Sequence, residues 1–544
     1  MSNSHPAQRY QLAATELPSV LSSFDISLGK EIIEKLATLN LGELVNDSRQ
    51  VKTDDVFCAI IGHEQDGNAY IEKAIQQGAS VVIAQCQLQS EHGKTEWLNA
   101  QKRLVLKISF YQLAQQSFEL ASAYYQAPQT QQTLIGITGT NGKTSTSQIC
   151  AHLLSAVNEP AGNNCAVIGT NGAGLLGQLK EINNTTPGSM ELMSLLAKFN
   201  GQSVSHVAME VSSHAMSQQR VSSEMFDVAV FTNLSRDHLD YHQTMENYAQ
   251  AKFSLFAASS AQIAIFNVAD SYGAKFYQQL LAQRNDDAKN MVAYALNGTS
   301  LHSSESIDQQ AQYSQFVFAE NVTHHANGVN FVLKTHCGDQ QINSPLLGDF
   351  NIENLLAAIA VLVSKNVALD KIAHAVRGLT PVAGRMECFA QDNLPTTIVD
   401  YAHTPDALEN ALIAARQHCN GALWAVFGCG GNRDKGKRSL MGKVAESSAD
   451  HIVLTNDNPR NEQPEDIVND ILSGCRAPEK ITVCLDRQQA VTNTLNQASA
   501  DDVILLAGKG HEDYIVIGNE KINYDERALV RSLYRAKQQA GQTV

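Results

Sequence analysis

Short apolar runs that end abruptly in polar clusters recur along this chain. In the middle they read TLIGI followed by TGTNGKT, HVAM by EVSSH, VAVF by TNLSRDH and QIAIF by NVAD. Towards the C-terminus they read TIV followed by DYAHTP, ALWAVF by GCGGNRDKGKR, HIVL by TNDNPR and DVILLA by GKGHE. Such runs, rich in Val and Ile and separated by helix-length segments, predict buried parallel strands of an α/β fold. Ligands of these sheets bind beyond the carboxyl ends of the strands, so each polar cluster marks a candidate site.

The length of 544 residues predicts about three domains. Polar segments at 123–132 and 378–387 read as the linkers between them. We therefore expect a smaller mixed α/β domain over residues 1–127, with a helix after Asn68 and a strand at Ser80 to Ala84. We expect a central domain with a P-loop-type parallel sheet over 128–379 and a C-terminal Rossmann-like parallel sheet domain over 380–544. Residues 297–345 read as an antiparallel excursion from the central domain.

Charge and cysteine usage narrow the class of partner. The formal net charge of −15 argues against sequence-independent binding of nucleic acid. The ten cysteines form no CxxC pair, and no basic segment followed by an apolar stretch opens the chain, which predicts a reduced cytoplasmic protein. The apolar run LLAAIAVLV from Leu355 is about half of what a bilayer needs and predicts a core helix, with no membrane contact. We expect a monomer that acts on small molecules.

The segment TGTNGKT, residues 138–144, predicts a phosphate loop of unusual spacing. In the standard form four residues separate the first glycine from Gly-Lys-Thr, and here that first position holds Ile137. Gly139 and Gly142 nonetheless permit a tight turn, and a helix is expected to start near Lys143. Backbone N–H groups there suit a triphosphate, while Lys143 reaches the β- and γ-phosphates and Thr144 binds Mg²⁺. The alternative is a glycine turn with a solvated lysine.

The shortened TGTNGKTS form resembles the ATP loop of the Mur ligases and of their relatives, the folylpolyglutamate and cyanophycin synthetases. These enzymes use ATP to activate a carboxylate as an acyl phosphate, and an amine then displaces phosphate to form an amide. The resemblance runs from about Asn46 to Glu512. It implies that ATP is bound by Gly139, Thr140, Asn141, Gly142, Lys143, Thr144 and Ser145, with Ser145 in place of a second threonine.

Polar residues after the next strands match the magnesium ligands of this family. Glu210 in MEVSSH and His238 in TNLSRDHLDYH would, on their own, serve equally well as N-caps or solvated loop residues. The resemblance implies that Thr144 and Glu210 hold one Mg²⁺ and that Glu210, His238 and Lys252 hold a second. Lys252, in ENYAQAKFSLF, would be carbamylated by CO₂ and so become a carboxylate-like ligand. From the sequence alone, Lys252 reads as a surface helix residue.

Further matches concern the nucleotide. Asn351 in GDFNIENLLAA matches the family's adenine-side motif, although an asparagine there could equally be the N-cap of the following helix. Arg385 in GRME, and Asp400 with His403 in VDYAHTPDALE, resemble the C-terminal domain's contribution to ATP binding. Without the resemblance, Arg385 would be an ordinary hinge cation. The division implies a gap between the central and C-terminal domains that closes for catalysis.

The segment NDSRQVKTDDVFCAIIGHEQDG resembles the domain that binds the uridine end of a UDP-N-acetylmuramoyl peptide, an intermediate of peptidoglycan synthesis. Taken alone, it reads as a strand-loop-strand piece of a core. NNTTPG and EVSSHAMSQQR supply further donors suited to the sugar, the peptide and its glutamate carboxylate. The residues that the resemblance implies for this substrate are Ser48, His63, Glu64, Gln65, Asn184, Thr185, Thr186, Ser212, Gln218 and Arg220.

The amine substrate is indicated by NDNPRNEQP. Arg460 at this strand end could bind a carboxylate through two parallel hydrogen bonds, which the side chain of a lysine substrate does not offer. Diaminopimelate offers it, because it is in effect lysine with a second amino acid head. Within the family, the DNPR form resembles the type that adds meso-diaminopimelate. The implied binding residues are Arg433, Asp457, Asn458, Pro459, Arg460, Gly508 and Glu512.

The loop GGNRDKGKR predicts a local positive field in this acidic chain. Arg433, Lys435, Lys437 and Arg438 stand there against Asp434 alone. Asn432 occupies a position where close relatives would carry aspartate, which leaves these roles intact.

Two competing functions remain open. A folylpolyglutamate or cyanophycin synthetase would share the loop and the magnesium ligands, but the DSR to GHEQDG segment and DNPR count against it. A nucleotide-switched binding protein would need no amino acid pocket, so GKGHE in a separate domain counts against that. The sequence therefore predicts an ATP-dependent acid–amino acid ligase that releases ADP and phosphate.

Overall fold

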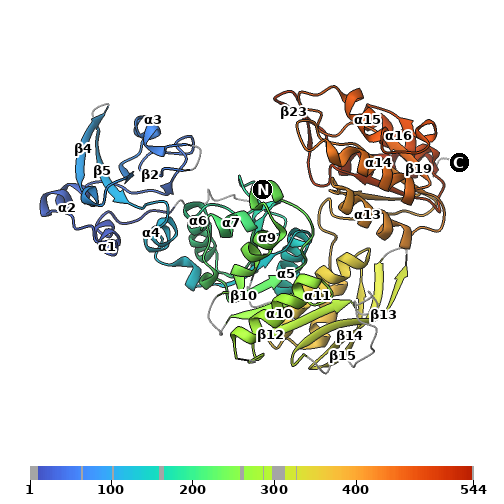
Figure 1. Ribbon diagram of the computed structural model, residues 1–544, viewed down its shortest axis with the longest axis horizontal. Coiled ribbons are helices and arrows are strands. Elements are labelled where there is room, and N and C mark those ends of the chain that lie inside the picture. Colours follow the sequence, from blue (N-terminus) through green and yellow to red (C-terminus); the bar gives the residue numbers. More distant parts are fainter. Residues whose placement is uncertain are drawn as a thin grey trace. The chain divides into compact units, whose positions relative to one another are not determined.

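The computed structural model describes residues 10–62, 65–100, 103–157, 164–257, 262–285, 287–296, 313–325 and 328–541. The chain forms two compact units, Met1–Phe266 with Asp270–Met291, and Asn267–Ala269 with Val292–Val544. Both contain mostly parallel sheets with helices between the strands, which confirms the predicted α/β class (Figure 1).

The first unit begins with a small mixed sheet. Its order is β1-β2-β3-β5-β4, and only the β4–β5 pair is antiparallel. The strands are β1 Leu44–Val45, β2 Val56–Ala59, β3 Val81–Cys86, β4 Thr95–Ala100 and β5 Arg103–Tyr111. The helices are α1 Leu17–Ser22, α2 Lys30–Leu36, α3 Ile71–Gln77 and α4 Ser117–Tyr124. The helix predicted after Asn68 and the strand predicted at Ser80 to Ala84 are thus confirmed as α3 and β3.

The larger sheet of the first unit carries the phosphate loop. Its strands lie in the order β8-β7-β9-β6-β10-β11, all parallel except β7–β8. They are β6 Thr133–Thr138, β7 Asn164–Gly169, β8 Gly172–Leu175, β9 Val204–Glu210, β10 Val228–Phe231 and β11 Ile263–Asn267. The helices are α5 Lys143–Val157, α6 Ser189–Gly201, α7 Ser213–Ser217, α8 Leu239–His242, α9 Met245–Phe253 and α10 Ser271–Gln283. The polar ends of β6, β9 and β10 thereby meet at one sheet edge.

The second unit opens with four strands and two helices. The strands are β12 Met291–Leu296, β13 Phe316–His325, β14 Gly328–Thr335 and β15 Gly338–Ser344. The pairs β13–β14 and β14–β15 are antiparallel, as predicted for this region. The helices are α11 Asp349–Ser364 and α12 Leu369–Arg377. Every residue from Leu355 to Val363 in α11 is buried, which confirms the predicted core helix.

The rest of the second unit is a parallel sheet covered on both faces. Its order is β16-β17-β21-β18-β19-β20, and only the edge strand β16 is antiparallel. The strands are β16 Glu387–Phe389, β17 Thr396–Asp400, β18 Leu423–Phe427, β19 His451–Leu454, β20 Thr482–Val483 and β21 Val503–Ala507, with the hairpin β22 Tyr514–Ile517 and β23 Glu520–Asn523. The helices are α13 Pro405–Gln417, α14 Gly436–Ser448, α15 Pro464–Leu472, α16 Arg487–Gln497 and α17 Glu526–Gly541.

Alternation along these strands explains the two helical layers. Ala425 and Phe427 on β18 face one core with α13, α14 and α15, while Val426 faces the other with α16 and α17. Successive side chains of a strand point to opposite faces, so a continuous apolar run is buried on both. This is the Rossmann-like arrangement that the sequence predicts. The boundaries at 127/128 and 379/380 stay predictions.

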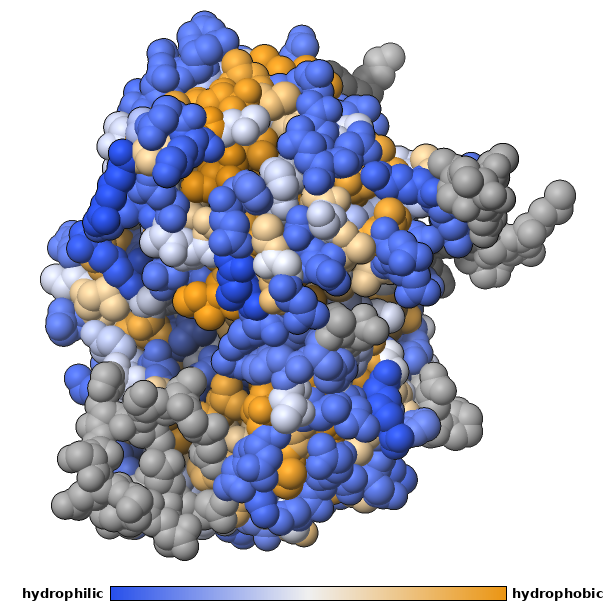
Figure 2. All heavy atoms as spheres, turned by 90° about the vertical axis from the view of Figure 1, so that its right-hand side faces the viewer, coloured by the Kyte–Doolittle hydropathy of each residue, from blue (hydrophilic) through white to orange (hydrophobic). Residues whose placement is uncertain are grey.

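On the face drawn in Figure 2, hydrophobic residues form small patches among hydrophilic ones. In the part of the chain that the structure describes, no helix has the length and apolar character needed to cross a membrane.

Candidate active site

The phosphate loop joins β6 to α5. Gly139 has φ +155°, and a Cβ there would lie 1.9 Å from Thr232 Oγ1, so no other residue fits without a shift. Helix α5 begins at Lys143, as predicted. The Lys143 ammonium lies over the loop and donates to the carbonyls of Gly139 and Thr140, both at 2.9 Å. The loop therefore holds a cation beside the backbone N–H groups of a helix start.

A buried carboxylate lies beside this loop. Glu210 ends β9 and is 1% exposed. Its Oε2 accepts hydrogen bonds from Thr144 Oγ1 at 3.0 Å and Thr170 Oγ1 at 3.1 Å, and its Oε1 accepts from the Thr170 N–H at 2.8 Å. The structure thus brings together the two predicted ligands of the first magnesium ion. Their oxygens are the donors that a hard divalent cation prefers.

His238 lies at the start of α8. It occupies the N-cap position of this helix, with φ +52°. Its side chain makes no capping hydrogen bond, so capping does not explain why a histidine stands there. The imidazole is 47% exposed, lies 3.3 Å from Asp237 Oδ2, and packs edge-on against the rings of His214 and Tyr248 at 4.9 and 6.0 Å. Among the described residues, no three His, Cys, Asp or Glu side chains form a metal-binding group.

Lys252 on α9 is a buried amine beside the phosphate loop. It is 1% exposed, so its interpretation as a surface residue is wrong. Its Nζ donates to the Gly139 carbonyl at 2.7 Å and lies 4.5 Å from the centre of the Tyr248 ring. In the described part of the chain no carboxylate pairs with it. Burial, and then the charge of Lys143, hold the pKa of Lys252 well below its ordinary value.

Four of the predicted muramoyl-peptide residues surround the end of β9. Thr186 Oγ1 donates to the Glu210 carbonyl at 2.8 Å and accepts from the Ser212 N–H at 3.0 Å. Arg220 Nη1 donates to the Thr186 carbonyl at 3.3 Å, and Thr185 lies next in sequence. Part of this set also serves the fold, because the Ser212 hydroxyl caps α7.

The other residues predicted for this substrate are dispersed. Asn184 and Gln218 are exposed, and Gln218 Nε2 donates to the hydroxyl of Tyr241 at 3.4 Å. In the segments that follow β1 and β2, Ser48 is buried and Gln65 is exposed. His63 and Glu64 lie outside the described residues.

In the second unit, Asn351 is buried within the first turn of α11. The N-cap of this helix is Gly348, so the alternative role of Asn351 as a cap is wrong. Asn351 Nδ2 donates to the Leu347 carbonyl at 2.9 Å, and its Oδ1 accepts from Asn354 Nδ2 at 3.3 Å. The side chain is thereby held in one orientation.

Arg385, Asp400 and His403 lie around the end of β17. The buried Asp400 carboxylate accepts two backbone N–H bonds, of 2.7 and 2.8 Å. Burial raises its pKa, and the charge of Arg385 opposes this only in part. The Arg385 guanidinium lies over the Tyr401 ring at 4.8 Å, and its buried Nε has no hydrogen-bond partner. His403 Nδ1 hydrogen bonds the Tyr401 carbonyl at 2.8 Å. An arginine with an unsatisfied donor fits an anionic ligand.

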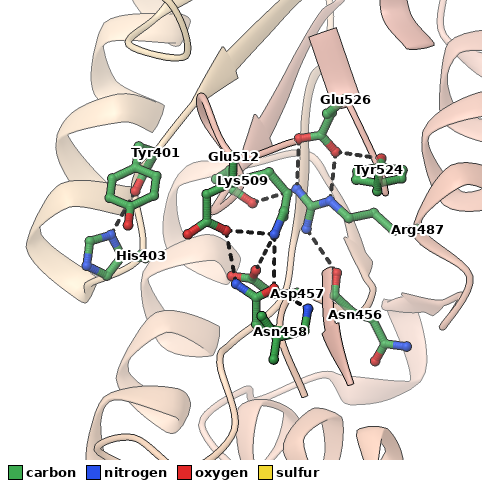
Figure 3. A network of polar contacts seen from close by, with 12 residues as sticks. Tyr401, His403, Asn456, Asp457, Asn458, Arg487, Lys509, Glu512, Tyr524 and Glu526 are labelled. Atoms are coloured by element: carbon green, nitrogen blue, oxygen red, sulfur yellow. Dashed lines mark hydrogen bonds and ion pairs between the residues drawn. The ribbon is translucent and has the colours of Figure 1, made fainter. Parts of the chain in front are cut away.

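The ends of β19 and β21 carry a dense polar network (Figure 3). At its centre Lys509, which is fully buried, donates to Glu512 Oε2 at 2.7 Å and Asn458 Oδ1 at 3.1 Å, and lies 3.5 Å from Asp457 Oδ1. Asn458 Nδ2 also donates to Glu512 at 3.0 Å. Gly508 has φ +108°, and a Cβ there would lie 2.9 Å from Asp457 Oδ2, which explains the glycine. The structure therefore brings Asp457 and Asn458 of DNPR together with Gly508 and Glu512 of GKGHE.

A second buried cation fixes the backbone under this network. Arg487 on α16 pairs with Glu526 on α17 through bonds of 2.7 and 3.0 Å, with both side chains fully buried. It also donates to the carbonyls of Asn456 at 3.1 Å and Ala507 at 2.9 Å. These carbonyls directly precede the DNPR and GKGHE segments, so Arg487 ties the starts of the two segments together. Burial alone would lower the pKa of Arg487, but the charge and hydrogen bonds of Glu526 outweigh burial, so the pKa of Arg487 is raised.

The structure adds Lys509 and Arg487 to the residues that the sequence indicates. Lys509 stands inside GKGHE, and a lysine three residues before a glutamate is a usable signal for an ion pair. Arg487 carries no local signal, since its partner is 39 residues away.

Arg460 is ordered by the hairpin. Its φ is +53°, its N–H donates to the Val516 carbonyl at 3.0 Å, and its own carbonyl accepts from Gly518 at 2.8 Å. Its Nη1 donates to the carbonyl of Gly431 at 2.9 Å. Nη1 also donates to the carbonyl of Asn458 at 3.4 Å. Because both bonds use Nη1, the donors on Nε and Nη2 remain for a ligand.

The predicted basic loop is less positive than its composition suggests. Arg438 is fully buried and donates to Glu462 at 3.0 Å and Asp470 at 2.8 Å. Lys435 also lies 3.3 Å from Glu462. The prediction that all four cations supply a positive field is wrong for Arg438, because acids 24 and 32 residues later neutralise it.

The chain is similar to proteins of a known family. Three family models match the chain: "Mur ligase family, catalytic domain" over 43–125, "Mur ligase middle domain" over 137–362 and "Mur ligase, glutamate ligase domain" over 384–510. The UDP-N-acetylmuramoyl-L-alanyl-D-glutamate–2,6-diaminopimelate ligase of Haemophilus influenzae is 42% identical over 90% of this chain and 96% of its own. The ligase of that name from Vibrio vulnificus is 43% identical over 92% and 95%.

Solved structures agree. A structure of UDP-N-acetylmuramoyl-L-alanyl-D-glutamate–2,6-diaminopimelate ligase has a TM-score of 0.61 at 31% identity, covering 91% of this chain and 95% of that one. A folylpolyglutamate synthase of Mycobacterium tuberculosis shares the fold at 16% identity, with a TM-score of 0.56 over 73% and 92%. The class is therefore that of ATP-dependent ligases. Within it, the chain belongs to the Mur ligase family.

Proposed function

We propose that this chain joins an amine of meso-diaminopimelate to the glutamate carboxylate of UDP-N-acetylmuramoyl-L-alanyl-D-glutamate in peptidoglycan synthesis. ATP supplies the driving force and leaves as ADP and phosphate. The observation that carries this function is the extent of the identity, 42% over 90% of this chain and 96% of a relative that bears this ligase name. The phosphate loop and Glu210 lie within the matched Mur ligase middle domain, residues 137–362, and the DNPR segment lies within the matched glutamate ligase domain, residues 384–510.

The first unit is proposed to handle the phosphoryl group. The N–H groups from Gly139 to Ser145 and the Lys143 ammonium bind the ATP phosphates. Thr144 and Glu210 fit Mg²⁺, because their adjacent buried oxygens are hard ligands. When bound, Mg²⁺ neutralises the charge that gathers between phosphate and carboxylate. Thr185, Thr186, Ser212 and Arg220 orient the muramoyl peptide, with Asn184 and Gln218 at its edge. Ser48, His63, Glu64 and Gln65 bind the uridine end.

Lys252 is proposed to carry a carbamate. A neutral amine nitrogen bonds to the carbon of CO₂ and a proton is released, which turns the side chain into an anion. The burial of Lys252, its lack of a carboxylate partner and its lowered pKa support this modification. With His238 and Glu210 it would complete a second magnesium site.

The second unit is proposed to bind the base of ATP and the amino acid. Asn351 contacts adenine, and Arg385, Asp400 and His403 complete the nucleotide site. Arg460 and Arg433 hold the distal carboxylate of diaminopimelate, and Glu512 meets an ammonium group. Asp457, Asn458, Pro459 and Gly508 shape the pocket. Domain limits at 127/128 and 379/380, a monomeric state and a cytoplasmic location are proposed on the sequence.

Phosphate release tests this function. The purified chain is incubated with ATP, Mg²⁺ and the UDP-muramoyl dipeptide, and then with diaminopimelate or lysine. We expect release that requires both the dipeptide and diaminopimelate, with lysine a poor substitute. Release that needs neither would indicate a nucleotide switch, and equal rates with lysine would contradict the proposed amino acid.

A further inference from the structure

The fully buried Lys509 is surrounded by polar side chains. Its ammonium makes two hydrogen bonds, to Glu512 Oε2 at 2.7 Å and Asn458 Oδ1 at 3.1 Å, and one ion pair with Asp457 at 3.5 Å. The Tyr514 ring lies 5.5 Å from it. Two of its three donors are used in these hydrogen bonds and the charge faces Asp457, so the buried ammonium is enclosed by groups of the protein itself. Lys509 therefore acts on the pocket through the residues that it holds.

Lys509 fixes which oxygen of Glu512 is available. Oε2 receives the bonds from Lys509 and from Asn458 Nδ2, whereas the other oxygen points away from Lys509 in Figure 3. Burial raises the pKa of Glu512, but the hydrogen bond and charge of Lys509 outweigh it, so the pKa is lowered. The carboxylate stays ionised with one oxygen turned outward, as an ammonium ligand requires.

Asn458 links Lys509 to the backbone of Arg460 through Val516. Its Oδ1 accepts from Lys509 and also from the Val516 N–H at 2.9 Å. The Val516 carbonyl in turn accepts from the Arg460 N–H at 3.0 Å. Lys509 is thus linked through one amide to the hairpin strand that orders Arg460, and the ammonium-binding and carboxylate-binding ends of the pocket share this support.

Charge gives Lys509 a second effect. Asp457 and Glu512 are both within reach of its ammonium, and Asp457 Oδ1 is buried without a hydrogen-bond partner. Without Lys509, two negative charges would act on the incoming amine. At neutral pH lysine carries one more net positive charge than diaminopimelate, so an excess of negative charge would favour lysine. The Lys509 charge opposes that preference.

We propose that Lys509 is a positioning residue that orients Glu512 and Asn458 and, by its charge, disfavours lysine relative to diaminopimelate. This inference rests on the proposed function, because it concerns the same amino acid pocket. It assigns specificity to a side chain that makes no contact with the substrate.

Steady-state kinetics of Lys509→Met test the inference. We expect the KM for diaminopimelate to rise at least about tenfold and the ratio of kcat/KM for diaminopimelate over lysine to fall at least about tenfold. The KM values for ATP and the UDP dipeptide should change less than about twofold. A purely structural role would not separate these substrates.

Two further variants make the result decisive. Lys509→Gln keeps N–H donors without the charge, so it serves if Lys509→Met does not fold, and it should lose the preference over lysine. Lys521→Met is the matched control, because this exposed lysine lies 4.0 Å from the same Tyr514 ring and should leave all constants unchanged. A folded Lys509 variant with wild-type KM and preference would overturn the inference. A wild-type chain that forms no amide would instead overturn the proposed function.

Discussion

Two fully buried lysines, one in each unit, have opposite surroundings. Lys252 meets a carbonyl at 2.7 Å and an aromatic ring at 4.5 Å. Lys509 meets the carboxylates of Glu512 at 2.7 Å and Asp457 at 3.5 Å. Burial penalises the charged form of an amine, and a nearby anion or a hydrogen-bond acceptor offsets part of the penalty. The comparison teaches that two equally buried lysines can differ in their partners: Lys509 has carboxylates beside its ammonium, whereas burial without a carboxylate partner lowers the pKa of Lys252.

The largest expected effect concerns Lys252. Replacing it with alanine should lower kcat at least about 1000-fold, because a proposed ligand of the Mg²⁺ ion that stabilises the transition state is lost. A carbon-13 signal of a carbamate should appear in the wild type equilibrated with labelled bicarbonate and vanish in the variant. Activity within tenfold of wild type would show that Lys252 is not a ligand.

The buried pair under the amino acid pocket should dominate stability. Arg487→Met leaves the Glu526 carboxylate buried without a partner, and we expect it to lower the free energy of unfolding by about 3–5 kcal/mol. The double variant Arg487→Met/Glu526→Leu should recover much of this loss, since no charge is stranded. Urea unfolding measures both. A loss below about 1 kcal/mol in the single variant would show that the two loops are fixed by other contacts.

Arg460 should control the choice of amino acid. Arg460→Lys keeps the positive charge but loses the planar fork, so the KM for diaminopimelate should rise about 30- to 100-fold while the KM for ATP stays constant. Competition between diaminopimelate and lysine in one reaction gives the preference directly. Unchanged preference would move the specificity away from this segment.

The smallest expected effect is on acid stability. The hydrogen bond from Arg438 lowers the pKa of Glu462 to about 2, from an ordinary value of 4.5. The unfolded chain then binds more protons than the folded one between these values, so the Glu462 contribution is complete above pH 4.5 and is lost as the pH falls towards 2. Glu462→Gln should flatten the rise of unfolding free energy with pH in that window. An unaltered slope would contradict the assignment.

The sequence predicted the framework well. The runs VAVF, HIVL and DVILLA became β10, β19 and β21, because a continuous apolar run between helices can be buried only in a covered parallel sheet. The phosphate loop could also be predicted from a short stretch of sequence, since its strand, its glycines, Lys143 and its helix follow one another along the chain. Both depend on neighbours in sequence.

The buried charges could not be predicted in the same way. Lys252 reads as a surface residue until Gly139, 113 residues earlier, is placed against it. Arg438 reads as part of a basic loop until Glu462 and Asp470 are packed beside it. In each case the environment is made by distant segments, and only the resemblance to the family indicated the role of Lys252.

Oxygen-18 in the glutamate carboxylate of the UDP dipeptide tests the central claim most directly. If the carboxylate is activated as an acyl phosphate and then captured by diaminopimelate, each phosphate released should carry one labelled oxygen, in equal amount to the amide formed. Amide formation with unlabelled phosphate would contradict this account.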